Sequence, residues 1–268
     1  MKTILYLALI YCVLLIMLTV FQRKIIYYPL RLDKDFEFPL YVPQPEEVFI
    51  TCDDGCTING LFVPGSEKKP TVLIFHGNAG NITHRGFLLR GFNTLGYSAL
   101  LIDYHGFGKS EGAPSEKNLY RDGKAALKWI TEEKNRRPED IILFGKSLGS
   151  GVAVELATQY SFKGLMLESS FTSLVSVARS HFPYNCFPVS LMLMDTYDNS
   201  TKISKIDSPV FIRHGTEDTI VDKREGEKLF EQATMPKELY FIEGADHNNM
   251  HLHPSYWTTI AAWLEGLT

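Results

Sequence analysis

Residues 141–157 read IILFGKSLGSGVAVELA, and this stretch decides the fold class. Its first four residues are apolar, as in a buried strand, and the residues after Gly149 follow a helical pattern. Between them, residues 145–149 form a G-x-S-x-G pattern at a strand-to-helix turn. Such a turn lifts the serine hydroxyl above the sheet edge, and its glycines avoid collisions with the neighbouring strand and helix. The pattern predicts an activatable serine nucleophile at Ser147.

The same pattern occurs again at residues 108–112 (GKSEG), so the pattern alone does not identify a nucleophile. The preceding strand is expected to end several residues before Ser110, and Pro114 prevents a helix from starting directly behind it. Ser110 is therefore predicted to be a loop residue. The Gly-Lys-Ser tripeptides also suggest a phosphate-binding loop, but that motif requires glycine where this chain has Asp103 and Asp140. The sequence disfavours an NTPase.

The composition is that of an ordinary globular protein. The chain has 268 residues, of which 45% are hydrophobic and 22% are charged, which is enough for one large core. The net charge is -4 and no basic run is present. Nucleic acid is therefore not expected as a partner.

The N-terminus is the exception, because residues 4–21 carry no charge. As a helix this run is ~27 Å long, close to the ~30 Å hydrocarbon core of a bilayer. Arg23 and Lys24 follow directly, whereas a cleaved signal peptide usually has a shorter apolar run and small residues at its cleavage site. We expect residues 1–24 to be a retained single-pass membrane anchor. Basic residues favour a cytoplasmic catalytic part by a small margin, which leaves the side of the membrane open.

A proline-bearing connector is expected at residues 25–45, followed by one catalytic domain at residues 46–268. In this domain two antiparallel strands come first, and then short β-rich runs alternate with helical patterns. Such alternation predicts an α/β fold with a mostly parallel sheet and helices on both faces. The predicted strands are residues 47–51, 57–63, 72–75, 98–102, 141–144, 165–167, 210–212 and 239–242, and the clearest helices are residues 116–134, 148–160 and 222–233.

Chemically capable side chains follow strand after strand, at the sheet edge where functional loops gather. A serine hydroxyl needs a base to take its proton, and a histidine oriented by a carboxylate serves this purpose. In the chain order serine, acid, histidine, the residues that fit are Ser147, Asp218 and His247, each just past a predicted strand. Glu168 is the alternative acid, because it too follows a strand.

His251 and His253 are the rivals of His247 as the base, although they fall later, towards the final helix. The three histidines are also spaced as a metal cluster, but no cysteine or carboxylate is placed to complete it. Two further histidines, His105 and His214, are interpreted as ordinary polar or packing residues.

The oxyanion that forms at an attacked carbonyl needs backbone N–H donors. One is expected at Leu148, directly after the nucleophile, and the other at Asn78, in the loop after the third predicted strand. His76 begins the same loop and is expected to brace it.

Residues 171–207 lie between two predicted strands and are the natural place for a small cap. Their apolar, proline-broken sequence fits an acyl-binding groove above Ser147, and it fits a helix packed on the sheet equally well.

Cys52 and Cys56 flank a predicted hairpin turn, where free thiols are favoured over a geometrically demanding disulfide.

Together these stretches resemble the α/β-hydrolase superfamily and, more narrowly, its Bem46-like group, which includes membrane-anchored enzymes related to protein depalmitoylases. The resemblance covers roughly residues 48–264. It implies hydrolysis of an acyl ester or thioester, lipid or acyl-protein, without metal or organic cofactor, and a triad of Ser147, Asp218 and His247. The matching stretches are HGNAGN (76–81), DYHGFGKSEG (103–112), GKSLG (145–149), SSFTS (169–173), GTED (215–218) and GADHN (244–248).

Two departures from the group stand near these motifs. His105 occupies a position where relatives usually carry arginine, and residues 220–222 replace a more usual Val-Pro after the acid. Two other functions stay open beside ester or thioester hydrolysis. A serine peptidase would use the same triad on amides, and a catalytically silent, membrane-tethered binding protein would use the same scaffold.

Overall fold

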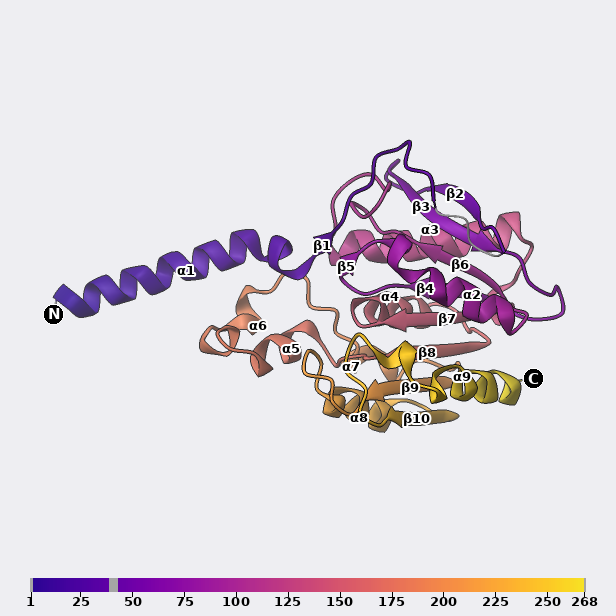
Figure 1. The fold of residues 1–268 in the computed structure, drawn as a ribbon. Coiled ribbons are helices and arrows are strands. Elements are labelled where there is room, and N and C mark those ends of the chain that lie inside the picture. The colour runs from indigo at the N-terminus through magenta and orange to yellow at the C-terminus, as the bar shows by residue number, and fades with distance from the viewer. Residues whose placement is uncertain (1, 39–42, 268) are drawn as a thin grey trace.

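A computed structural model describes residues 2–38 and 43–267, and an eight-stranded sheet forms its centre (Figure 1). The strand order is β10-β9-β8-β7-β4-β6-β3-β2. Neighbouring strands are parallel, except that β3 runs antiparallel to both β2 and β6. The strands are β2 (Glu46–Thr51), β3 (Thr57–Val63), β4 (Thr71–Phe75), β6 (Ser98–Ile102), β7 (Ile141–Lys146), β8 (Gly164–Glu168), β9 (Val210–Gly215) and β10 (Lys237–Ile242).

Helices cover both faces of the sheet, because the side chains of each buried strand alternate between two apolar clusters. In β4, Leu73 and Phe75 pack towards α3, α4 and α8, whereas Val72 and Ile74 pack towards α2 and α9. These helices are α2 (Gly86–Thr94), α3 (Glu116–Glu133), α4 (Leu148–Ala157), α8 (Lys223–Gln232) and α9 (Ser255–Gly266). The α/β fold and the antiparallel first pair of strands are therefore confirmed.

The N-terminal helix α1 (Lys2–Ile26) projects from this body (Figure 1). It is the one helix in the described ranges that is long and apolar enough to cross a membrane, with a mean hydropathy of 2.8 over its best window. The chain that follows it packs on the catalytic domain. Tyr27 is buried, and the short strand β1 (Tyr28–Pro29) pairs in parallel with β5 (Ala79–Gly80).

Between β8 and β9 the chain leaves the sheet and forms several short helices beside the base of α1 (Figure 1). We call residues 171–207 the cap. Its helices are α5 (Leu174–Ser180), η3 (Tyr184–Cys186), α6 (Val189–Met192) and α7 (Ser200–Ile203). The remaining short helices are η1 (Ile82–Arg85), η2 (Pro138–Asp140) and η4 (Met250–Leu252).

Candidate active site

Ser147 lies at the tight turn between β7 and α4, at the carboxyl end of the central strands. Its φ is 49°, in the left-handed region that residues other than glycine rarely adopt. Its backbone N–H donates to the carbonyl of Glu168 (2.8 Å), and its carbonyl accepts from the hydroxyl of Ser150 (2.6 Å). A Cβ on Gly149 would lie 2.1 Å from the carbonyl oxygen of Phe75. Only glycine there lets α4 approach β4 closely enough to make the turn.

His247 and Asp218 meet at the same edge of the sheet, since they follow β10 and β9. Nδ1 of His247 lies 2.7 Å from Oδ2 of Asp218. An ionised carboxylate only accepts hydrogen bonds, so Nδ1 carries the proton and Nε2 is left as a base. Among the described residues no hydrogen bond joins the Ser147 hydroxyl to His247. Such contacts are often long in an enzyme without substrate and tighten in the reacting complex.

Asp218 is held by several further donors. Its Oδ1 accepts from the backbone N–H groups of Ile220 (3.0 Å) and Val221 (2.8 Å). Nε2 of His214 lies 3.3 Å from its Oδ2. Burial alone would raise the pKa of Asp218, but the hydrogen bonds from His214 and His247 outweigh burial and hold this pKa well below its usual range. The carboxyl is therefore ionised at neutral pH.

The contact with His214 is one that sequence reasoning missed, because His214 was interpreted as a packing residue. It is buried, and its Nε2 also donates to the carbonyl of Val221 (2.8 Å), so it closes the loop around Asp218. Its place four positions before the predicted acid, at the end of the same strand, was the available signal.

The loop after β4 lies against Ser147. A Cβ on Gly77 would be 3.5 Å from the Cβ of Ser147, so the backbone of this loop is close to Ser147. The next residue, Asn78, donates from its side chain to the carbonyl of Ile26 (2.9 Å), the last residue of α1. The carbonyl of Asn78 accepts from the backbone N–H of Tyr28 (3.0 Å). The end of the N-terminal helix is thus fixed to this loop.

Two backbone donors are available beside Ser147. The N–H of Asn78 makes no hydrogen bond with another described residue. The N–H of Leu148 is the first in α4, where no acceptor exists within the helix. As expected, His76 braces this loop, because its Nδ1 lies 2.7 Å from the carbonyl of Gly77 and its Nε2 lies 3.2 Å from Asp103.

A cavity of about 380 Å³ opens over Ser147, a size typical of small-molecule sites. Asn78 and Leu148 line it together with Ser147, so the residues that carry both backbone donors border the same space as the serine. Most of its remaining lining is apolar and comes from α1 and the cap. These lining residues include Leu18, Ile25, Leu174, Val177, Phe187 and Leu193.

Glu168, the alternative acid, belongs to a different buried group. Its carboxylate lies 2.7 Å from Nζ of Lys146 and 3.6 Å from Arg213. Burial alone would raise the pKa of Glu168, but the charges of Lys146 and Arg213 keep it below the usual value. Glu168 is thus an ion-pair partner, and its backbone carbonyl supports the turn at Ser147.

The alternative bases have other neighbours as well. The ring of His251 stacks on Phe87, with ring centroids 4.3 Å apart. Of His247, His251 and His253, only His247 has a carboxylate partner among the described residues. The three histidines form no group of potential metal ligands; the groups of that kind in the described ranges lie around His105.

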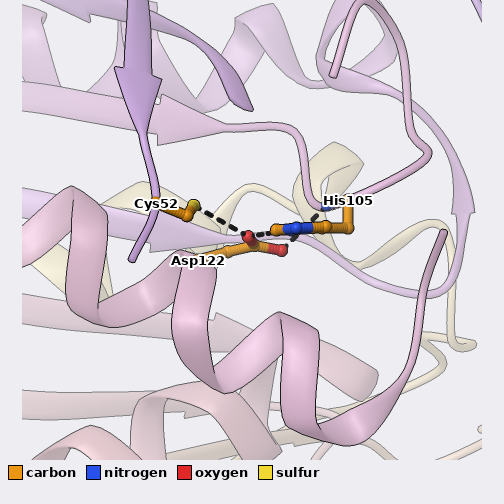
Figure 2. Close-up of side chains that lie close together, drawn as sticks. All are labelled: Cys52, His105 and Asp122. Carbon is orange, nitrogen blue, oxygen red and sulfur yellow. Dashed lines mark hydrogen bonds and ion pairs between the residues drawn. The ribbon is translucent and has the colours of Figure 1, made fainter. Parts of the chain in front are cut away.

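Figure 2 shows this second cluster, in which Cys52 and His105 both point towards the carboxylate of Asp122. Metal-ligating atoms of these three buried residues lie within 4.8 Å of one another. The carboxylate accepts from the Cys52 thiol (3.5 Å) and from Nδ1 of His105. Burial and the charge of Asp122 raise the pKa of the Cys52 thiol, whereas a metal ligand must be a thiolate. We interpret the cluster as a structural hydrogen-bond network; all four cysteines are free thiols.

Comparison with known proteins identifies the fold family. Alpha/beta hydrolase domain-containing protein 17B of Homo sapiens is 38% identical over 217 residues, which are 78% of this chain and 72% of that protein. The chain is an α/β-hydrolase. An uncharacterized protein of Mycobacterium tuberculosis is 35% identical over 233 residues, 86% of this chain and 82% of its own length.

Two further comparisons agree with this family. The profile of the family described as "Serine aminopeptidase, S33" matches residues 66–182. Among solved structures, an esterase of Pyrococcus furiosus superposes with a TM-score of 0.71 at 20% identity, covering 90% of this chain and 98% of that one. At this identity the superposition shows the common fold. The α/β-hydrolase resemblance expected from the sequence is confirmed.

Proposed function

We propose that this hydrolase is a membrane-anchored serine hydrolase that cleaves carboxylic ester or thioester bonds. Ser147 is its nucleophile, His247 its base and Asp218 the acid that orients the base. The observation that carries the proposal is the left-handed, glycine-flanked turn that presents Ser147 to a cavity, at the edge of the sheet where His247 is bonded to the buried carboxylate of Asp218.

In the proposed reaction, Nε2 of His247 takes the proton of the Ser147 hydroxyl while Oγ attacks the substrate carbonyl carbon. The N–H groups of Asn78 and Leu148 bind the resulting oxyanion. When the oxyanion collapses, the alkoxide or thiolate leaves with the proton from His247, and an acyl-Ser147 ester remains. A water molecule then repeats the sequence and releases the carboxylic acid. Asp218 stays ionised and stabilises the imidazolium in both steps.

The expected substrate is lipid-like, because the cavity beside Ser147 is mainly apolar. Residues 1–24 act as the membrane anchor, residues 25–45 connect it to the catalytic domain at residues 46–268, and the acyl chain lies beneath the cap. The length and hydropathy of α1 support the anchor. The contacts of α1 with the catalytic domain also support a helix that stays part of the protein. Cleavage of α1 would remove the residues that form one side of the cavity.

The test uses the full chain purified in detergent. A fluorophosphonate probe should label it once, and mass spectrometry of the digested adduct should place the phosphonate on Ser147. Ser147→Ala should remain unlabelled. A folded chain that hydrolyses short esters without reacting with the probe would rule out the serine mechanism. A chain that neither reacts nor turns over any substrate would favour a silent binding protein.

A serine peptidase is the second candidate, since the matching family profile carries an aminopeptidase description. A panel of oxygen esters, thioesters and aminoacyl amides, each with short and long acyl groups, separates the two. We expect turnover of esters or thioesters to exceed that of amides. Preferential cleavage of aminoacyl amides would instead identify a serine peptidase.

The membrane anchor has a separate test. We expect the full chain to stay with the membrane fraction during carbonate extraction.

A further inference from the structure

The last turns of α1 present one face to the catalytic domain. From Lys2 to Leu14 every residue is exposed, and then partly or fully buried positions recur at the spacing of one helical face. A helix that served only as a tether would need no such face. The residues on it are Leu15, Leu18, Thr19, Gln22, Ile25 and Ile26.

Polar contacts lock this face onto the cap. Gln22 is 5% exposed, and its side-chain amide donates to the carbonyl of Met192 (3.1 Å) and accepts from the backbone N–H of Met194 (2.7 Å). Arg23 forms an ion pair with Asp195 (3.1 Å). Since both ends of a buried amide are bonded, the position of α1 relative to the cap is defined.

The locked helix forms one wall of the cavity over Ser147. Leu18 and Ile25 of α1 line this space together with Val177 and Phe187 of the cap. Ser147 borders the same space, so the group that fills it can be attached to the carbonyl that Ser147 attacks. An unbranched acyl chain is the occupant that matches an apolar space beginning at this serine.

The cap itself extends along α1 into the apolar run. Tyr11 donates from its hydroxyl to the carbonyl of Cys186 (3.2 Å), and its ring stacks on Phe187. Around this contact the cap exposes large apolar side chains, with Phe182 at 81% and Leu191 at 87% of full exposure. An exposed apolar surface beside a spanning helix is typical of a surface that contacts lipid.

The length of α1 decides how deep this surface lies. A bilayer needs about 20 helical residues, which rise ~30 Å. Counted from Lys2, such a span ends near Gln22 and Arg23, the first polar residues after the apolar run. Residues 11–21, which lie beside the cap, are then within the hydrocarbon. Because the cap contacts α1 from Tyr11 to Gln22, we expect its exposed apolar residues to lie in the same leaflet.

We propose that the cap and the last turns of α1 form one acyl-chain groove immersed in the near leaflet, and that the substrate's acyl chain enters it sideways from the bilayer. This inference rests on the proposed serine hydrolase. It makes the anchor helix a specificity-determining part of the site, with Leu18 as the residue on α1 that limits the space for the chain.

The kinetic test compares two tryptophan substitutions on α1, both in the full chain in mixed micelles. Leu18→Trp narrows the groove, whereas Val20→Trp adds the same side chain at an exposed position. Each buried methylene improves kcat/KM about fourfold, and the indole displaces at least two of them. We expect Leu18→Trp to lower kcat/KM for p-nitrophenyl palmitate at least tenfold more than kcat/KM for p-nitrophenyl acetate, whereas Val20→Trp should change neither ester.

The depth test is independent of catalysis. In vesicles of brominated phosphatidylcholine, the added fluorescence of Leu191→Trp should be quenched. That of Tyr160→Trp, an exposed aromatic position behind α4, should not be quenched. Equal quenching at both sites, or equal loss of both esters in Leu18→Trp, overturns the groove. A wild-type chain that hydrolyses neither ester overturns the proposed function instead, while the quenching result still decides the depth of the cap.

Discussion

Two segments of this chain share the sequence Gly-Lys-Ser-x-Gly, at residues 108–112 and 145–149, and the fold uses them in opposite ways. The Ser110 hydroxyl is buried, donates to the carbonyl of Asp103 (2.9 Å) and accepts from the N–H of Asn59 (2.8 Å). Ser147 lies in a left-handed turn and lines a cavity. A serine whose hydroxyl makes two hydrogen bonds inside the core has no room for a substrate. The surroundings of the two serines, rather than their shared pattern, therefore make Ser147 the candidate nucleophile.

The two lysines differ in the same way. Nζ of Lys146 lies 2.7 Å from Glu168 inside the protein, next to Arg213. Nζ of Lys109 lies 2.8 Å from Glu47, whose side chain is 30% exposed. The first pair lies at the turn that carries Ser147, because Lys146 precedes this serine and the carbonyl of Glu168 accepts its N–H. The second pair joins a loop to β2 at the edge of the sheet.

The largest expected effect is the difference in kcat between alanine variants of the two serines. Ser147→Ala should lower kcat for p-nitrophenyl butyrate by roughly 10⁴ to 10⁶, as removal of a triad nucleophile does. Ser110→Ala should keep kcat near the wild-type value. It should instead lower the free energy of unfolding by about 1–3 kcal/mol, because the buried N–H of Asn59 loses its acceptor. The reverse pattern of activities would make Ser110 the nucleophile.

The acid gives the next largest effect. Asp218→Asn should lower kcat by about 10⁴, since the amide no longer holds His247 in the correct tautomer. Glu168→Gln should act mainly on stability, because Glu168 pairs with Lys146 and Arg213. Steady-state kinetics of both variants, with circular dichroism to confirm folding, decides between them. Near-normal kcat in Asp218→Asn with a large loss in Glu168→Gln would transfer the role to Glu168.

Stability separates the two lysines. Lys146→Met should lower the free energy of unfolding by roughly 3–5 kcal/mol, because it leaves the buried carboxylate of Glu168 without its nearest partner. For Lys109→Met the loss should be about 1 kcal/mol. The carboxylate of Glu47 is partly exposed to water, and it still accepts a hydrogen bond from the side-chain amide of Asn59. Thermal unfolding in detergent measures both. Equal shifts in the melting temperature would show that the burial of Lys146 and Glu168 does not make their ion pair more important for stability than that of Lys109 and Glu47.

The smallest effect concerns pH and the loop that carries Ser110. Burial alone would lower the pKa of His105, but its hydrogen bond to Asp122 and the nearby carboxylates outweigh burial and raise it. The resulting stability is fully present below the unfolded pKa of about 6.5 and is lost as pH rises through the folded pKa. A loss of 1 kcal/mol lowers the melting temperature of a domain this size by ~2–4 °C.

The control for this pH effect is His105→Arg, which keeps a positive charge next to Asp122 at every pH. Its melting temperature should fall less than that of the wild type between pH 6 and pH 9. If the melting temperatures of the two proteins change with pH in parallel, the His105–Asp122 pair is not the cause of the pH dependence.

Sequence alone predicted much of this protein. Strands and helices carry their own periodicity, so the alternation around residues 141–157 was sufficient for the fold class. Because parallel strands end at a common edge, the residues that follow them, Asp218 and His247 among them, were expected to meet. The turn at Ser147 was also predictable, because Gly145 and Gly149 are needed where the backbones of neighbouring elements come close together.

What only the tertiary structure decided are contacts between segments far apart in the chain. No local pattern shows that Ser110 is bonded to Asn59, that His214 closes the loop of Asp218, or that Gln22 of the apolar helix is bonded within the cap. Hydropathy predicted that α1 is a tether, whereas the structure shows that residues on one of its faces line the cavity at Ser147. Periodicity reports which side of an element is apolar, whereas the partner of that side depends on the path of the whole chain.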